Sequence, residues 1–345
     1  MLLRSLSLIS VLAASLFISA CGDSGSAPAA AGGVKVGLLL TGSSSDNGWN
    51  QLANDSLASI SKDQKIDFLT RQDVKKDNAA DAIRQFESKG YNLVILHGYE
   101  YLDVAKELSD PSKPGAVKIK MSVSGGDVDS PNFQSLLYDL GPASYQLGII
   151  AAKVSKTGKL GFIGGQPFPT VTAMQHGFEA GAKSVNPAAT VVPVYTDDWS
   201  DPAKAKSKAE GLFSQGVDVV MQNVDAAGSG VFEAVKEYNA SLAKRTPQIV
   251  YTFGANSNQN DNKICPDYTL ASAVIKMDAC FAATVQEVKD GKFKTGVIHE
   301  DLANGNALAV LNPKLTGKVI DADTQKLVDD AAKKFAAGQI TIPTQ

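Results

Sequence analysis

Two loops of this 345-residue chain each place a tryptophan among polar side chains, and such a pair could bind a flat ligand. The loops read TGSSSDNGWN at 41–50 and TDDWSD at 196–201. They contain Trp49 and Trp199, the only two tryptophans of the chain. Indoles on opposite sides of a cleft could stack on a heterocycle while Asp46 and Asn50 contact its polar edges. The alternatives are local packing of Trp49 in a helix and a hydrophobic staple at Trp199.

Four further polar residues directly follow apolar runs that are typical of strands, namely Asp139, Asp225, Asn256 and Lys276. Ligands of open parallel sheets bind beyond the carboxyl ends of the strands, so residues in these places are candidate ligand contacts. The alternative for the aspartates is helix capping, and for Lys276 it is a surface position with its stem on apolar neighbours. For Asp201, directly before Pro202, we expect the cap.

No pattern in the sequence is typical of catalysis. The three histidines are far apart and fit no metal-ligand spacing, and there is no G-x-S-x-G motif. Residues 156–159 (KTGK) contain the Gly-Lys pair of a phosphate-binding loop but lack its earlier glycine and its final Ser or Thr. We therefore expect a binding protein without metal or cofactor. Lys and Arg total 33 against 36 Asp and Glu, a net charge of −3 that excludes a strongly basic nucleic-acid-binding surface.

The N-terminus has the layout of an export signal. Residues 1–20 contain a short positive region, an apolar stretch and small residues before Cys21. The ISAC segment at 18–21 is similar to a lipobox, in which the cysteine is lipidated after cleavage. Residues 21–33 are rich in Gly, Ala and Ser and predict a flexible tether. No later run is long and apolar enough to span a bilayer, so we expect a lipid anchor alone, on the periplasmic or outer cell-surface side.

The two remaining cysteines, Cys265 and Cys280, are candidates for a disulfide. An exported compartment permits the bond, and closing a loop of about fifteen residues stabilises a fold by roughly 3 kcal/mol in the chain-entropy model. The alternative is two separate buried thiols. We expect the disulfide.

Strand-like apolar runs alternate with helix-like amphipathic stretches in two successive series. The expected strands are 34–40, 66–69, 93–97 and 117–123, then 160–163, 191–195, 217–221 and 249–253. The expected helices are 47–60, 79–89, 102–108, 142–154, 171–184, 202–214 and 231–238. This alternation predicts an α/β fold with two parallel sheets covered on both faces.

The last hundred residues are less regular. They predict strands at 270–275 and 307–311, a helix at 277–288 and a short strand at 340–342. A final helix is expected to begin at the cap Asp323 and to end at Gly338.

Three blocks in succession resemble the basic membrane protein family of ABC-transporter substrate-binding lipoproteins, whose best-known members are purine nucleoside receptors. The blocks are 148–187, 200–204 (SDPAK) and 228–236 (GSGVFEAVK). The resemblance spans most of the mature chain and implies a type I periplasmic binding protein fold, with two doubly wound lobes joined by a hinge. We expect one lobe to contain 34–140 and about 255–305, and the other 141–254 and about 306–345. The implied partners are a small ligand and an ABC permease with a separate ATPase, and we expect a monomer.

The resemblance also implies roles for single residues. Trp49 takes the place of a stacking Phe, Asn50 that of a base-reading Asn, and Trp199 lies where members tend to have Phe. Asp139 and Lys276 match a ribose-side carboxylate and the family lysine.

The chain departs from the family pattern at Asn256 and Asn258, where members often have Asp, and around 140–144. An amide has one acceptor where a carboxylate has two, so the bound sugar could differ. We expect a purine nucleoside or a related heterocycle. The alternatives are a free nucleobase, a simple sugar, or a surface lipoprotein without a transport role. The enzyme alternative is a hydrolase that acts on nucleosides, which the missing metal and nucleophile patterns disfavour.

Overall fold

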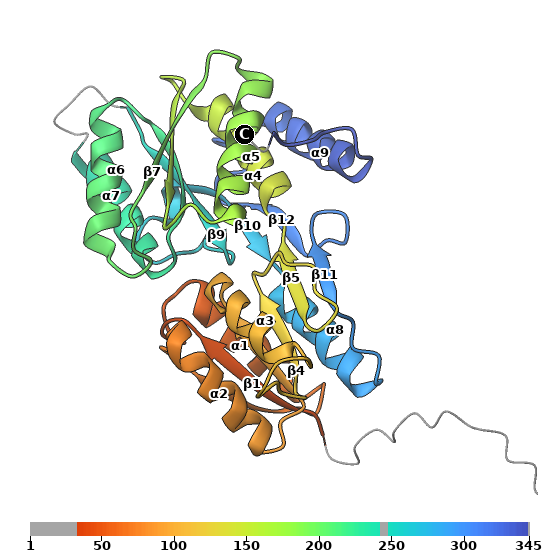
Figure 1. The fold of residues 1–345 in the computed structure, drawn as a ribbon. Coiled ribbons are helices and arrows are strands. Elements are labelled where there is room, and N and C mark those ends of the chain that lie inside the picture. The colour runs from red at the N-terminus through yellow and green to blue at the C-terminus, as the bar shows by residue number, and fades with distance from the viewer. Residues whose placement is uncertain (1–32, 242–247, 344–345) are drawn as a thin grey trace, which may run out of the picture.

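A computed structural model describes residues 33–241 and 248–343 of the chain. The expected signal segment, the lipidation site Cys21 and nearly all of the tether lie outside the described residues. The described chain forms two α/β lobes, drawn in orange and in green in Figure 1, with the C-terminal part of the chain contributing to both.

The first lobe is built on a parallel sheet with the strand order β11-β5-β4-β3-β1-β2. Its strands are β1 (Lys35–Leu40), β2 (Asp67–Arg71), β3 (Leu93–His97), β4 (Lys120–Ser124), β5 (Gln134–Tyr138) and β11 (Gly296–Glu300). Its helices are α1 (Trp49–Ser61), α2 (Lys76–Ser88), α3 (Leu102–Ser109) and α8 (Met277–Lys289). Helices α1 and α8 pack on one face, and α2 and α3 on the other, so the central strands are buried on both sides.

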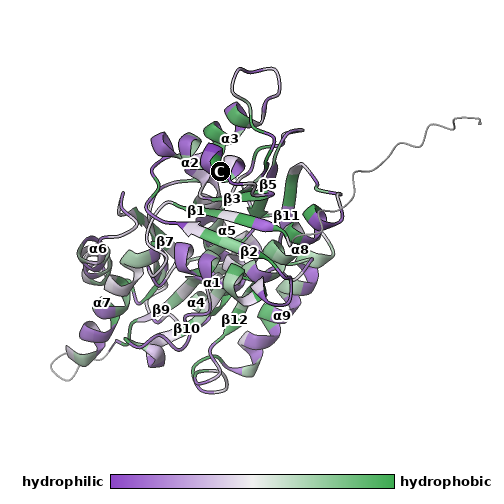
Figure 2. Cartoon of the chain, turned by 90° about the horizontal axis from the view of Figure 1, so that it is seen from below, coloured by the Kyte–Doolittle hydropathy of each residue, from purple (hydrophilic) through white to green (hydrophobic). Residues whose placement is uncertain are grey.

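The second lobe repeats this plan with the strand order β12-β10-β9-β8-β6-β7. Its strands are β6 (Lys159–Gly164), β7 (Thr190–Tyr195), β8 (Val219–Asn223), β9 (Tyr251–Asn256), β10 (Thr269–Ile275) and β12 (Ala307–Leu311). Its helices are α4 (Gly141–Val154), α5 (Pro169–Val185), α6 (Pro202–Ser214), α7 (Gly228–Ser241) and α9 (Ala322–Ala336). All pairings are parallel except that of β10 with β12. Figure 2 shows hydrophobic residues, in green, along the strands and hydrophilic ones, in purple, on α2, α6 and α7.

Helices α4 and α5 approach each other unusually closely, and glycines make this possible. A Cβ atom added at Gly181 would lie 1.9 Å from the Tyr145 carbonyl oxygen, and one at Gly148 would lie 2.1 Å from the Phe178 carbonyl oxygen. The two backbones therefore pack without intervening side chains at these points, which fixes the helix pair rigidly on the second sheet.

Three segments connect the lobes in the described part of the chain. They lie between β5 and α4, between β10 and α8, and between β11 and β12. Backbone hydrogen bonds join them in pairs, because the Asp139 N–H donates to the Glu300 carbonyl and the Lys276 N–H donates to the Asn306 carbonyl. These crossings form the hinge of the molecule.

The observed elements confirm the expected α/β fold, with two differences in the lobe plan. The chain returns to the first lobe only at α8, because β10 lies inside the second sheet between β9 and β12, so the expected boundary near 255 is too early. Strand β11, which pairs with β5, had no counterpart in the sequence prediction. Its sequence GVIHE is only partly buried, so it lacks the continuous apolar run of a central strand such as LVILH in β3.

Two local expectations at the C-terminus are wrong. Helix α9 is capped by Asp321, whose carboxylate accepts a hydrogen bond from the Thr324 N–H, and not by Asp323, which lies in the first turn. Residues 340–342 form no strand. The helix end is close to its expected place, since Gly338 follows α9 with φ of 67°.

The predicted disulfide does not form. Cys265 and Cys280 are free and buried, and they belong to two different hydrophobic clusters of the core. The Cys265 thiol lies 3.8 Å from the Thr269 hydroxyl, and the Cys280 thiol donates to the Lys276 carbonyl at 3.2 Å. The alternative of two separate buried thiols is therefore the observed one.

Candidate binding site

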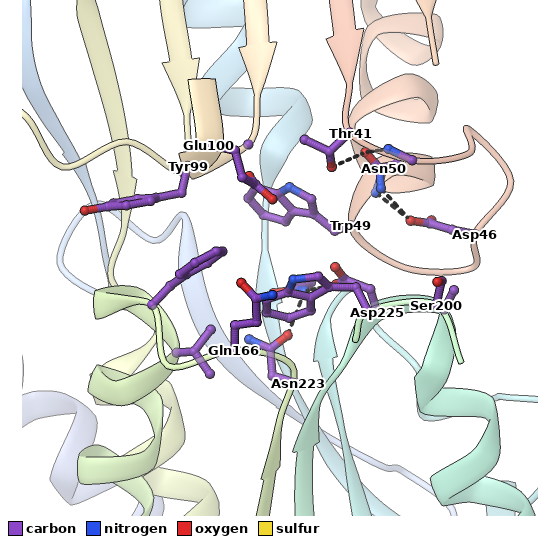
Figure 3. A pocket seen from close by; sticks show the side chains of 18 of the residues that line it. Thr41, Asp46, Trp49, Asn50, Tyr99, Glu100, Gln166, Ser200, Asn223 and Asp225 are labelled. Carbon is purple, nitrogen blue, oxygen red and sulfur yellow. Dashed lines mark hydrogen bonds between the residues drawn. The ribbon is translucent and has the colours of Figure 1, made fainter. Parts of the chain in front are cut away.

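A cavity of about 790 Å³ lies between the lobes, a volume in the range of small-molecule sites. The loops that follow β1 and β3 line it from the first lobe, and those that follow β6, β7, β8 and β9 line it from the second (Figure 3). Six of the eight predicted site residues line this cavity: Asp46, Trp49, Asn50, Trp199, Asp225 and Asn256. The carboxyl ends of the strands thus bring together residues from four separate parts of the chain.

Trp49, the first residue of α1, is held as a platform on the first-lobe wall. His97 stacks on its indole with a centroid separation of 4.0 Å and an interplanar angle of 20°. Tyr138 meets the indole edge-on at 5.7 Å. A Cβ added at Gly125 would lie 3.2 Å from the same ring. Trp49 also packs against the core cluster that contains Leu57, so local packing and a cavity position occur together.

Asp46 and Asn50 mainly hold the loop that carries Trp49. The Asp46 carboxylate accepts hydrogen bonds from the backbone N–H groups of Gly48, Asn50 and Gln51 and from the Asn50 amide. The side-chain oxygen Oδ1 of Asn50 accepts a hydrogen bond from the Gly42 N–H at 3.3 Å. Asp46 therefore satisfies free N–H groups at the start of α1, which otherwise has no side-chain cap.

Trp199 lies on the second-lobe wall directly over a glycine. A Cβ at Gly165 would come within 2.2 Å of the indole, so only glycine fits beneath the ring in this position. Phe168 lies 5.9 Å from Trp199, and it stacks on Tyr99 of the first lobe at 5.3 Å and 25°. This aromatic contact crosses the cleft, so the two lobes already touch at one side of the cavity. The cap expected at Asp201 is confirmed, because its carboxylate accepts from the N–H groups at the start of α6.

Asp225 brings a second-lobe carboxyl group to the first lobe. A Cβ at Gly48 would lie 3.0 Å from the Asp225 Cα, and the Asn256 amide donates to the Asp225 carboxylate at 3.2 Å. Burial raises the pKa of Asp225 well above its usual range, and the carboxylates of Asp46 and Glu100 add to the rise.

Asp225 and Asn256 also have positive φ, at 49° and 64° respectively. Such backbone conformations cost energy for non-glycine residues and are concentrated at binding sites. Both residues lie directly where a strand of the second lobe ends at the cavity.

Asp139 and Lys276 do not line the cavity but lie in the hinge crossings. The Asp139 carboxylate accepts from the Gly141 N–H at 3.0 Å, and burial raises its pKa. Lys276 is exposed at the start of α8. Asp139 lies one residue before Leu140, the N-cap of α4, and bonds to the first N–H of that helix. Lys276 has the surface position that the sequence left open as an alternative.

Several lining residues were missed, chiefly Tyr99, Glu100, Gln166, Phe168 and Asn223. In Figure 3, Glu100 extends into the cavity beside Trp49, and Gln166 and Asn223 face it from the other lobe. Tyr99 and Glu100 directly follow β3, and Gln166 and Phe168 follow β6. The rule about strand ends therefore covers these residues too, although they follow strands at which no candidate was proposed.

The lining is strongly acidic. It contains the carboxylates of Asp46, Asp73, Asp77, Glu100, Asp197, Asp198 and Asp225, and the ammonium groups of Lys75 and Lys76. Asp198 pairs with Lys204 at 3.0 Å, and hydrogen bonds from Ser200 and Lys204 hold its pKa at about 2, so it is ionised. Such a lining favours ligands that donate hydrogen bonds and repels anions.

Neither a metal centre nor a membrane span is found among the described residues. No cluster of three or more His, Cys, Asp or Glu side chains there could hold a metal ion. None of the helices between 33 and 343, outside the gap at 242–247, has the length and apolar character needed to cross a bilayer.

Comparisons with known proteins agree with this geometry. Residues 33–344 match the family described as ABC transporter substrate-binding protein PnrA-like. Basic membrane protein A of Borreliella afzelii is 26% identical over 329 residues, covering 95% of this chain and 96% of that protein. The ABC transporter nucleoside-binding protein BmpA of Lactococcus lactis is 29% identical over 313 residues, covering 87% of this chain and 86% of that protein.

Solved structures show the same fold. A solute-binding protein of an ABC transporter system from Aeropyrum pernix superposes with a TM-score of 0.77 at 20% identity, covering 90% of this chain and 94% of that one. A second such protein, from Conexibacter woesei, gives a TM-score of 0.68 at 25% identity and covers 90% of this chain and 99% of that one. The two-lobed arrangement is therefore that of type I periplasmic binding proteins.

Proposed function

Because the chain belongs to the family of PnrA-like ABC transporter substrate-binding proteins, we propose that it captures a purine nucleoside or a closely related heterocycle between its lobes. Family membership makes it a substrate-binding protein and not an enzyme, with a small-molecule ligand and a permease and ATPase as partners. The nature of the ligand is the proposal, and the nucleoside-binding relative supports it.

The observation that carries the proposal is the pair of tryptophans in the walls of one cavity. Trp49 is fixed by His97 and Tyr138, and Trp199 is fixed over Gly165. Two rigid indoles offer the large flat apolar surfaces on which a bicyclic purine stacks. Base–aromatic stacking is worth about 1–3 kcal/mol for each ring by alanine substitution.

The polar lining fits a nucleoside better than a nucleotide. Glu100 faces the cavity with acceptor oxygens, and the amides of Gln166 and Asn223 offer both donors and acceptors. The N–H and O–H groups of a base and a ribose match such a surface. A phosphate would meet the carboxylates of six acidic residues, the buried carboxyl group of Asp225 and only two lysines, so we expect nucleoside monophosphates to bind at least tenfold more weakly.

Transport follows from closure of the lobes about the hinge. The ligand favours the closed state to the extent that it contacts both walls at once. The closed molecule then docks on a permease that a separate ATPase drives. The family is exported, and we further propose that a lipid on Cys21 anchors the mature protein to the outer face of a membrane.

The test is a thermal-shift and calorimetric panel on the mature protein without its lipid. The panel contains purine and pyrimidine nucleosides, free bases, nucleoside monophosphates and monosaccharides. A true ligand at a hundredfold excess over its Kd stabilises the fold by about 2.7 kcal/mol. A clear response to a monosaccharide, with none to any purine compound, would refute the nucleoside assignment and favour a sugar receptor.

Variants then test the stacking walls. Trp49→Ala and Trp199→Ala should each weaken purine binding by about 5- to 150-fold, the range that corresponds to 1–3 kcal/mol. Trp49→Phe and Trp199→Phe are the matched controls, because they keep an aromatic face and should lose much less. Full affinity in both alanine variants would eliminate the stacking mechanism.

A further inference from the structure

We propose that His97 is a positioning residue that holds Trp49 and Tyr138, two aromatic rings of the first-lobe wall, in the orientation that the ligand meets. His97 does not line the cavity and its side chain is fully buried. The proposal rests on the proposed function of this cavity as the ligand site.

His97 belongs to a closed network of contacts that also contains Trp49, Ser124 and Tyr138. Its imidazole stacks on Trp49, and its Nε2 atom lies 3.0 Å from the Trp49 carbonyl oxygen. Its Nδ1 atom lies 2.8 Å from the Ser124 hydroxyl, which in turn lies 2.8 Å from the Tyr138 hydroxyl. Tyr138 closes the network by its edge-on contact with Trp49. One imidazole thus restrains both the backbone and the ring of Trp49, and it holds Tyr138 through Ser124.

The chemistry of the groups fixes which one donates each hydrogen bond in this network. A carbonyl oxygen can only accept, so Nε2 of His97 carries the proton and donates to Trp49. Nδ1 of the neutral imidazole is then an acceptor, and the Ser124 hydroxyl donates to it. The Tyr138 hydroxyl must therefore donate to Ser124. Because each group has a single consistent role, the network allows one arrangement of the wall and disfavours others.

The neutral state that this arrangement needs is provided by burial. Burial lowers the pKa of His97 from 6.5 to about 3, and only the bond to the Trp49 carbonyl acts in the opposite direction. The ring of Phe281 from α8 also lies near the imidazole, with centroids 6.4 Å apart. The imidazole therefore stays neutral at any pH at which the protein would bind its ligand.

A purely space-filling role predicts a different outcome on substitution. His97→Phe keeps a ring of similar size under Trp49 but removes both hydrogen bonds. Ser124→Ala leaves the contact of His97 with Trp49 intact and breaks only the link to Tyr138. Tyr138→Phe removes the far end of the network and keeps the ring. Packing alone is preserved in all three variants, whereas the positioning network is broken in each.

The experiment measures adenosine binding and the emission of Trp49. In a Trp199→Phe background, Trp49 is the single tryptophan, so its emission maximum and its acrylamide quenching report on the wall itself. His97→Phe should weaken adenosine binding at least tenfold and shift Trp49 emission to the red. Ser124→Ala and Tyr138→Phe should each weaken binding about fivefold, as expected for one lost hydrogen bond. His176→Gln, outside the network, is the control and should match the parent protein.

The two readouts separate the two proposals. If the parent protein does not bind adenosine, the nucleoside assignment fails, while the emission and quenching of Trp49 without ligand still test the network. Unchanged Trp49 emission and unchanged affinity in His97→Phe would overturn the positioning role. If His97→Phe does not fold, Ser124→Ala and Tyr138→Phe decide, and parental values in both would overturn the proposal.

Discussion

Replacing His97 by Phe should remove a defined part of the acid sensitivity of this protein. The folded state keeps His97 neutral down to about pH 3, whereas the unfolded chain protonates it near 6.5. Between these values the unfolded state binds more protons, so stability rises with pH. Stability is therefore lost as the pH falls below 6.5, and the loss continues until the folded-state pKa is reached.

The size of the effect follows from the two pKa values. Between the two pKa values, each pH unit below 6.5 lowers the free energy of unfolding by about 1.4 kcal/mol. At pH 4.5, two units below 6.5, the unfolded state gains about 2.7 kcal/mol from protonating His97, whereas at pH 7.0 it gains only about 0.2 kcal/mol. The free energy of unfolding of the parent protein should thus fall by about 2.5 kcal/mol more than that of His97→Phe between these pH values.

Urea unfolding at pH 7.0 and 4.5, followed by circular dichroism and by tryptophan emission, measures this difference. Asp139 and Asp225, whose pKa values are raised by burial, are common to both proteins, so their contributions cancel in the comparison. His97→Gln serves as a second variant if the phenylalanine is not tolerated, and His176→Gln is the control. A gap between parent and variant that is the same at both pH values would refute the reasoning.

Two further predictions concern a glycine and the thiols. Gly165→Ala should push the Trp199 ring from its place and weaken ligand binding at least tenfold in calorimetry, because the new Cβ would lie 2.2 Å from the indole. Gly211→Ala in α6 is its control: no atom lies within 4 Å of the new Cβ, so affinity should stay and stability should rise by up to about 1 kcal/mol. Cys265 and Cys280 should resist a thiol reagent in the folded protein, because burial raises the pKa of Cys265 to about 12 and raises that of Cys280 too. After unfolding, both thiols should react without addition of a reductant, since they are free. An unfolded protein whose thiols react only after a reductant is added would contradict this.

The sequence allowed most of the fold to be predicted, because parallel strands covered on both faces are continuous apolar runs. Strands such as KVGLLL in β1 and LVILH in β3 were recognisable for this reason. Strand β11 was not, since its partly exposed sequence GVIHE lacks that signal. The sheet to which β10 belongs could not be predicted locally either, because its mainly apolar sequence TLASAVI would fit the centre of either sheet. Pairing of strands is decided by contacts between distant segments.

The site was predictable to the extent that the rule about strand ends applies. Trp49 and Trp199 follow strands whose chain continues within the same lobe, and their loops therefore reach the cleft. Asp139 and Lys276 also follow strands, but there the chain leaves for the other lobe. Their backbones are tied to neighbouring crossings, so these positions become part of the hinge instead of the cavity wall. The strand-end rule placed both residues in the predicted site and the family resemblance agreed with it, because sequence alone does not distinguish the two kinds of strand end.

Electrostatics across the cleft explain why closure should depend on a ligand. In this structure burial raises the pKa of the Asp225 carboxyl group of the second lobe, and the nearby carboxylates of Asp46 and Glu100 from the first lobe raise it further. The Tyr99–Phe168 stack and the bond between the Gln259 amide and the Asn47 carbonyl at 3.4 Å are modest opposing contacts. A ligand that donates N–H or O–H groups to these carboxylates relieves the repulsion only when both lobes surround it. Its affinity for the closed state then exceeds that for the open state, which is the condition for a ligand to drive the change.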